Sequence, residues 1–188
     1  DAGNAQLTLH DGTAVKLTIK TGYPADGRIR ITVEPAERKE FSIKVRLPAW
    51  CRESSLKPSG AKLGADGYTV WRRKWKPGDT IELNLKLEPR IVIGDHLNQG
   101  KAAVLYGPLV LTADEALLTG TNQSLQGLAL PKADLAALAV TPEAAAASRK
   151  PWPGTQVFRV NATAPGGGAP FTARLVPFAD AGSTGQRY

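Results

Sequence analysis

The sequence predicts an all-β protein, folded as an antiparallel β-sandwich of jelly-roll-like type. Over about the first ninety residues, apolar and polar side chains alternate with period two, which is typical of strands with one buried and one solvated face. Turn dipeptides such as Asp26-Gly27 separate these runs, and glycine readily adopts the positive φ of tight turns. Of the 188 residues, 42% are apolar and 22% are charged, which excludes a disordered or coiled-coil chain and predicts a packed core.

Four alternating runs define the first strands, which we expect over residues 15–20, 28–34, 41–47 and 81–88. In the third run, Ile43 and Val45 flank Lys44 in the middle of the alternation, so we expect both to be almost inaccessible to solvent. Pro48 ends this strand because it has no N–H for a ladder hydrogen bond. Trp50, just beyond it, is expected to pack over the edge of the core.

Two motifs in this half of the chain have clear structural interpretations. Trp75 followed by Gly78-Asp79 predicts a hairpin in which the indole covers the core and the carboxylate bonds backbone amides of the turn. Pro24 and Gly27 are expected to shape the exit from the strand that ends near residue 21.

The pattern changes from Ile91 onward. The apolar runs 102–106 and 109–111, separated by Gly107-Pro108, are too continuous for a sheet with one wet face, so we expect them to be buried on both sides. Strand patterns return at 156–160 and 171–176.

Between these strands lies a stretch, 113–155, that is rich in Ala, Leu, Gly and Pro. We expect an insertion with one or two short helices, over 132–139 and 142–148. Thr141 is a suitable N-cap and Pro142 fits the first helical turn.

This pattern predicts two consecutive small sandwiches, 1–95 and 96–188, the second carrying the insertion at 113–155; one larger sandwich is the alternative. No apolar stretch is long enough to span a membrane, and the first residues lack the pattern of a signal peptide. Because the sequence opens on Asp1 rather than Met, we expect it to be a piece of a longer protein.

Charge and reactive residues give little sign of chemistry. The net charge is +7, but the basic residues are spaced singly between apolar ones, which indicates solvated strand faces rather than a nucleic-acid surface. Cys51 and the two histidines lack zinc-binding spacings, so we expect no metal or cofactor. The acidic pairs 79/82 and 114/115 lie beside turns, where we expect solvated carboxylates rather than a catalytic pair.

The aromatic residues leave two interpretations open. Tyr68 and Trp71 have opposite parity on one expected strand, so one of them must face away from the local core. Packing in a core or interface accounts for most of these rings, and stacking on a sugar is the alternative. The candidate sugar-contacting residues are therefore Tyr68, Trp71 and Trp152.

Five segments occur in an order that resembles a known family. They are TGYPADG (21–27), FSIKVRLPAW (41–50), GYTVWRRKWKPGDTIEL (67–83), KAAVLYGPLVL (101–111) and LVPFADAG (175–182). Together they resemble the C-terminal β-sandwich region of glycoside hydrolase family 127, the β-L-arabinofuranosidase-like enzymes formerly classed as a domain of unknown function. The motif residues, for which we expect structural roles, are Tyr23, Pro24, Arg46, Pro48, Trp50, Trp75, Gly78, Asp79, Gly107 and Pro108.

The resemblance implies β-sandwich domains that follow an (α/α)6 catalytic barrel, in enzymes that release L-arabinofuranose from plant glycans. It also implies that the catalytic glutamates and the zinc-bound catalytic cysteine belong to the barrel. Cys51 matches no catalytic motif, so no catalytic, metal or cofactor residue is carried onto this chain. The tail at 185–188 stops where the family continues into another strand, so we expect the C-terminal part to be incomplete.

The resemblance makes the chain a non-catalytic accessory region of a glycoside hydrolase, inactive alone, whose partner is the barrel of the same polypeptide. An independent carbohydrate-binding module for plant glycans and a structural interaction domain are the alternatives. We expect no nucleic-acid or membrane partner, self-association of the isolated chain through an apolar surface, and a secreted or periplasmic location for the parent protein.

Overall fold

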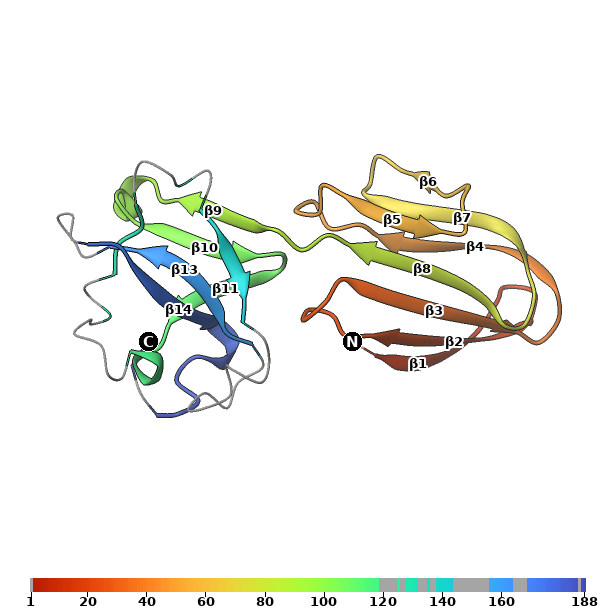
Figure 1. The fold of residues 1–188 in the computed structure, drawn as a ribbon. Helices are drawn as coiled ribbons and strands as arrows, with labels where there is room; N and C mark the ends of the chain where they lie inside the picture. The colour runs from red at the N-terminus through yellow and green to blue at the C-terminus, as the bar shows by residue number, and fades with distance from the viewer. Residues whose placement is uncertain are drawn as a thin grey trace. The chain divides into compact units, whose positions relative to one another are not determined.

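The computed structural model describes residues 2–118, 125, 128–131, 135, 138–143, 156–163, 169–185 and 187–188. The chain forms two compact units, Asp1–Leu87 and Glu88–Tyr188. The described strands pair in antiparallel sheets (Figure 1), so the all-β prediction is confirmed. The boundary between the units falls after Leu87, whereas the expected boundary was after residue 95. Strand β9 (Pro89–Ile93) lies in the second unit because it pairs with β10 (Ala102–Tyr106).

The first unit contains two sheets. Its strands are β1 (Gly3–Thr8), β2 (Ala14–Thr21), β3 (Arg28–Pro35), β4 (Lys39–Arg46), β5 (Ser54–Lys57), β6 (Lys62–Leu63), β7 (Tyr68–Trp75) and β8 (Asp79–Leu85). The five-stranded sheet has the order β1-β2-β3-β8-β5, and the three-stranded sheet has the order β4-β7-β6. The four alternating runs of the sequence form β2, β3, β4 and β8, as predicted.

Aspartates close the tight turns of this unit. The carboxylate of Asp11 accepts a hydrogen bond from the Thr13 N–H, and that of Asp66 accepts one from the Tyr68 N–H. Asp79 does the same for the N–H of Lys76 at 3.1 Å, which confirms the role expected for this residue. Such side-chain bonds satisfy amides that the strand ladder cannot reach, which is why Asp-Gly pairs separate the strands.

Both sheets contribute to the core of the first unit. Val33, Ile81 and Trp75 are 0% exposed. Trp75 lies against Phe41, with ring centroids 6.1 Å apart, and its indole N–H donates to the Phe41 carbonyl at 3.0 Å. The guanidinium of Arg73 lies 5.1 Å from the Trp75 ring. Trp75 thus covers the core, as the sequence predicted.

Ile43 and Val45 pack against this core but are only half-buried. The prediction that both are almost inaccessible is therefore wrong. Alternation identified the correct face, but β4 is the edge strand of the three-stranded sheet, and an edge strand has a neighbour on one side only.

The second unit contains one six-stranded sheet with the order β12-β13-β14-β11-β10-β9. Besides β9 and β10, its strands are β11 (Leu109–Ala113), β12 (Val140–Pro142), β13 (Phe158–Ala162) and β14 (Phe171–Pro177). Short 3-10 helices are η1 (His96–Asn98), η2 (Glu115–Leu117) and η5 (Phe178–Asp180). None of the helices in the described ranges is long and apolar enough to cross a membrane. Phe158 is fully buried in the main cluster on one face of the sheet.

Two expectations for this unit are corrected. Val110 on β11 is 46% exposed and Ala103 on β10 is exposed, so the runs around Gly107-Pro108 are not buried on both sides. Thr141 and Pro142 lie in β12 rather than at a helix start, because Val140 is buried in the core and pairs with Val160. Tertiary pairing overrides the capping signal here. The remainder of both expected helices lies almost entirely outside the described residues.

Asp114 also differs from its expected solvated state. It is completely buried, and its carboxylate accepts hydrogen bonds from the Ala116 N–H at 2.9 Å and the Gly182 N–H at 2.8 Å. Glu115 beside it forms an ion pair with Arg187 and donates its backbone N–H to the Arg187 carbonyl. These contacts hold residues 182 and 187 against the end of β11.

Glu143 is a buried carboxylate between two arginines. Its Oε1 accepts hydrogen bonds from Nε of Arg159 at 2.8 Å and from Nε of Arg174 at 2.9 Å. Burial opposes ionisation of this carboxyl, but the two guanidinium hydrogen bonds outweigh it, and the pKa of Glu143 falls below its ordinary value of 4.5.

This lowered pKa predicts acid sensitivity of the second unit. A carboxyl with a lower pKa in the folded than in the unfolded chain stabilises the fold above its unfolded pKa, and this stabilisation is lost as the pH falls through the folded pKa. We expect the melting temperature of this unit to decrease on acidification from pH 5 to pH 3, with a weaker dependence in Glu143→Gln. Thermal unfolding across this range measures it, with Asp95→Asn as the exposed control. Equal pH dependence in Glu143→Gln and the unmodified chain would contradict the prediction.

Candidate functional site

A polar depression of about 740 Å³ lies on the outer face of the five-stranded sheet. We call it the polar groove. Its charged residues are Lys20, Asp26, Arg28, Arg30, Lys57 and Glu82, and its uncharged polar residues include Asn84. Its side chains come from β2, β3, β8 and β5 and from the turn between β2 and β3. It lies entirely within the first unit.

Strand alternation and register place these side chains together. In β3 and β8 the odd-numbered residues face the core, so the even-numbered ones face outward. Lys20 pairs with Arg30, Arg30 pairs with Glu82, and Glu82 pairs with Lys57. These four residues form one row across four strands. Asn84 lies in the neighbouring row, where it pairs with Arg28 on one side and Ser55 on the other.

Positive charge predominates in the groove. Its lining contains four cationic residues and the two acids Asp26 and Glu82, which leaves a surplus of two positive charges. Glu82 forms an ion pair with Arg30, and Asp26 forms one with Arg28 at 3.1 Å. Within the described residues, Lys20 and Lys57 have no ion-pair partner. These two lysines lie at opposite ends of the row.

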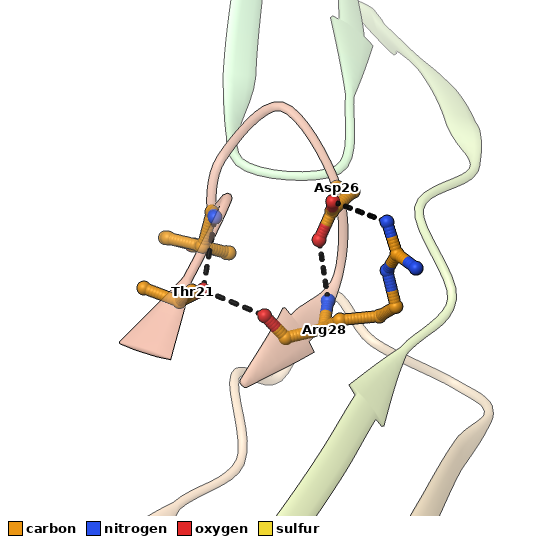
Figure 2. Close-up of polar contacts among 4 residues, drawn as sticks. Thr21, Asp26 and Arg28 are labelled. Carbon is orange, nitrogen blue, oxygen red and sulfur yellow. Dashed lines mark hydrogen bonds and ion pairs between the residues drawn. The ribbon is translucent and has the colours of Figure 1, made fainter. Parts of the chain in front are cut away.

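The turn that follows β2 contributes Gly22 and Asp26 to the lining of the groove, and Figure 2 shows its polar contacts. Thr21 Oγ1 donates to the Arg28 carbonyl at 2.7 Å and accepts from the Tyr23 N–H at 2.9 Å. Asp26 accepts from the Arg28 backbone N–H at 2.9 Å and from its guanidinium at 3.1 Å. These hydrogen bonds, the backbone one first, lower the pKa of Asp26, which therefore remains an anion.

Gly27 in this turn is a position where no side chain fits. It is buried, and its carbonyl accepts a hydrogen bond from the Leu85 N–H at 2.9 Å. A Cβ added at Gly27 would lie 1.8 Å from the carbonyl oxygen of Leu85. The glycine of the TGYPADG motif is therefore explained by the close approach of two backbones.

Two of the candidate sugar-contacting aromatics, Tyr68 and Trp71, do not line the polar groove. Trp71 is 2% exposed and its indole N–H donates to the Pro58 carbonyl at 2.9 Å, so its ring offers no face to a sugar. Its strand face was predicted correctly as opposite to that of Tyr68, which is 36% exposed. Trp152 lies outside the described residues.

The motif residues occupy turns and strand ends. Tyr23 is half-buried, and burial together with the nearby Cys51 raises its pKa. The peptide bond between Tyr23 and Pro24 is cis. The Pro48 carbonyl accepts from the Cys51 N–H at 3.0 Å, and Trp50 between them is half-buried.

The remaining motif residues also lie in turns or at strand ends. Arg46 is exposed at the end of β4. Gly78, with φ of 87°, donates its N–H to the Val33 carbonyl in the five-stranded sheet. Gly107 and Pro108 form the turn of the β10–β11 hairpin, and Gly107 donates to the Glu88 carbonyl.

The sequence did not predict the polar groove. Alternation placed Lys20, Arg30 and Glu82 on the solvated faces of predicted strands, but no strand was predicted around Lys57. The convergence of these four side chains depends on β8 pairing between β3 and β5. Among the described residues, no group of three or more His, Cys, Asp or Glu side chains could hold a metal ion.

The chain is similar to known glycoside hydrolases over 94% of its length. Residues 3–87 match the model of the GH127 middle domain of β-L-arabinofuranosidases. Among solved structures, a GH127 β-L-arabinofuranosidase from Geobacillus stearothermophilus T6 matches 94% of this chain with a TM-score of 0.75 and 25% identity. A glycoside hydrolase matches 94% with a TM-score of 0.74 and 21% identity, and a GH127 β-arabinofuranosidase matches 94% with a TM-score of 0.70 and 23% identity. No curated protein matches the chain.

The chain spans only about a third of these structures: 30% of the first and 31% of each of the other two. The predicted resemblance to the β-sandwich region of glycoside hydrolase family 127 is confirmed by these matches, in which residues 3–87 correspond to the model of that family's middle domain.

Proposed function

We propose that this chain is a non-catalytic accessory region of a β-L-arabinofuranosidase-type glycoside hydrolase and that it borders and stabilises a catalytic barrel in the same polypeptide. The match of residues 3–87 to the GH127 middle domain carries this proposal. The extent of the structural likeness supports it, because 94% of this chain corresponds to about 30% of each relative.

The carboxyl groups of the polar groove support a non-catalytic role. Glycoside hydrolysis requires a protonated acid for the leaving oxygen and a second carboxylate about 5 to 10 Å away. Both carboxyls of the groove, Asp26 and Glu82, are ion-paired with arginines. The lowered pKa of Asp26 also leaves it unprotonated at neutral pH.

An apolar surface on the second unit supports contact with a further domain. Val92, Ala103 and Val110 are exposed on β9, β10 and β11, and the register places Val92 opposite Ala103. Exposed apolar side chains gathered on one sheet face are typical of interaction surfaces. The larger size of the relatives supports a barrel of the same polypeptide as the occupant.

The test compares this chain with the complete reading frame that encodes it. We expect no turnover of an aryl β-L-arabinofuranoside by the purified chain and turnover by the full product. Turnover by the chain alone, or a reading frame without a barrel, would contradict the proposal.

A surface variant tests the contact itself. Val110→Asp is expected to lower the melting temperature of the full product by several degrees while changing that of this chain little. The matched variant Leu63→Asp, on exposed β6, should change neither much. Equal effects of Val110→Asp on both proteins would exclude this surface as the contact.

A further inference from the structure

We propose that the polar groove binds an acidic glycan, with its uronate carboxylates held by Lys20, Arg30 and Lys57. The positive surplus of the groove favours an anion. The choice of a glycan among anions rests on the proposed function, whereas the position and charge of the site do not.

The row formed by Lys20, Arg30, Glu82 and Lys57 contains three cationic side chains and one acidic one. Lys20 and Arg30 are opposite each other in the β2–β3 register, and like charges in that position destabilise a sheet. Glu82 forms an ion pair with Arg30, but no acidic side chain among the described residues forms one with Lys20 or with Lys57 at the other end of the row. The carboxylates of an acidic oligosaccharide would supply the missing negative charge at both ends and accept hydrogen bonds from these lysines.

Uncharged polar side chains lie beside this row. Ser55 and Asn84 lie in the adjacent row, and Thr32 lines the groove from β3. Hydroxyl and amide groups of this kind can both donate to and accept from sugar hydroxyls. The row crosses four strands, which spans about 14 Å at the usual strand spacing and suits an oligomer better than a single sugar.

The composition of the lining selects acidic over neutral glycans. None of the described residues that line the polar groove is aromatic, so a neutral arabinan would find no flat apolar surface for its rings. Charge and hydrogen bonds must therefore provide the affinity. Because the groove is open to solvent, its ionic contacts should weaken as salt rises.

Titration calorimetry and amide NMR on the whole chain test the site. The probes are an oligogalacturonide, a neutral arabino-oligosaccharide of equal length, and a short polyglutamate of equal charge. We expect the oligogalacturonide to bind at least tenfold more tightly than either other probe at low salt. The affected amides should be those of β2, β3, β5 and β8. Added salt should weaken this binding.

A matched pair of double variants separates a built site from general positive charge. Lys20→Gln with Lys57→Gln should weaken oligogalacturonide binding at least tenfold. Lys44→Gln with Lys74→Gln removes the same charge from exposed positions on β4 and β7 and should leave the binding unchanged.

Three results would overturn the proposal. Equal losses in the two double variants would show a non-specific charge effect. Polyglutamate binding as tightly as the oligogalacturonide at Lys20 and Lys57 would make the partner an acidic protein surface instead. No binding of the oligogalacturonide would exclude the site while leaving the accessory role, which the activity comparison tests separately.

Discussion

Trp75→Ala should destabilise the first unit by about 3–5 kcal/mol, the usual cost of removing a fully buried aromatic side chain. The ring is 0% exposed, packs on Phe41 and holds the Arg73 guanidinium over its face. The substitution would leave a cavity between the two sheets and remove the hydrogen bond to the Phe41 carbonyl. Denaturant unfolding followed through amide signals of each unit measures the effect.

Two controls accompany this measurement. Trp75→Phe keeps most of the buried surface and should cost distinctly less than the alanine variant. Amides of the second unit should unfold as before, since Trp75 belongs to the first unit alone. A cost below about 1 kcal/mol for Trp75→Ala would show that the core is not organised around this ring.

Gly27→Ala should be nearly as damaging, at about 3 kcal/mol or more, although it adds only a methyl group. The new Cβ would overlap the Leu85 carbonyl oxygen, and this atom is backbone that cannot rotate away. The β2–β3 turn or the end of β8 would have to move. Amides around residues 21–28 and 84–86 should show the largest shifts, and thermal unfolding gives the loss of stability.

Gly3→Ala is the matched control for this substitution. Nothing lies within 4 Å of a Cβ added at Gly3 in β1, so we expect a change of less than about 0.5 kcal/mol. Equal stability of the Gly27→Ala and Gly3→Ala variants would exclude the close backbone approach between Gly27 and Leu85.

Local patterns predicted much of the first unit. Alternation identified β2, β3, β4 and β8, and the Gly78-Asp79 turn and the buried Trp75 followed from residue type and spacing. What local patterns could not supply is which strands are neighbours. The half-burial of Ile43 depends on β4 being an edge strand, and the polar groove depends on β8 lying between β3 and β5.

The second unit shows the same limit more strongly. Asp114 resembles any solvated acid beside a strand end, but it is buried because the Gly182 N–H, far along the chain, reaches its carboxylate. Thr141-Pro142 has the composition of a helix start, yet pairing with β13 makes it a strand. In both places a long-range contact outweighs the local preference.

The strand order of the five-stranded sheet has a consequence for how the first unit folds. β3 and β8 are neighbours in that sheet, but the segment between Pro35 and Asp79 contains β5 and the whole three-stranded sheet. β1, β2 and β3 can form a meander from local contacts, whereas the β3–β8 pairing must close this long loop. We therefore expect the β8 amides to gain protection later than those of the β2–β3 hairpin. A protein shortened before Asp79 would leave β3 as an unpaired edge and be prone to aggregation.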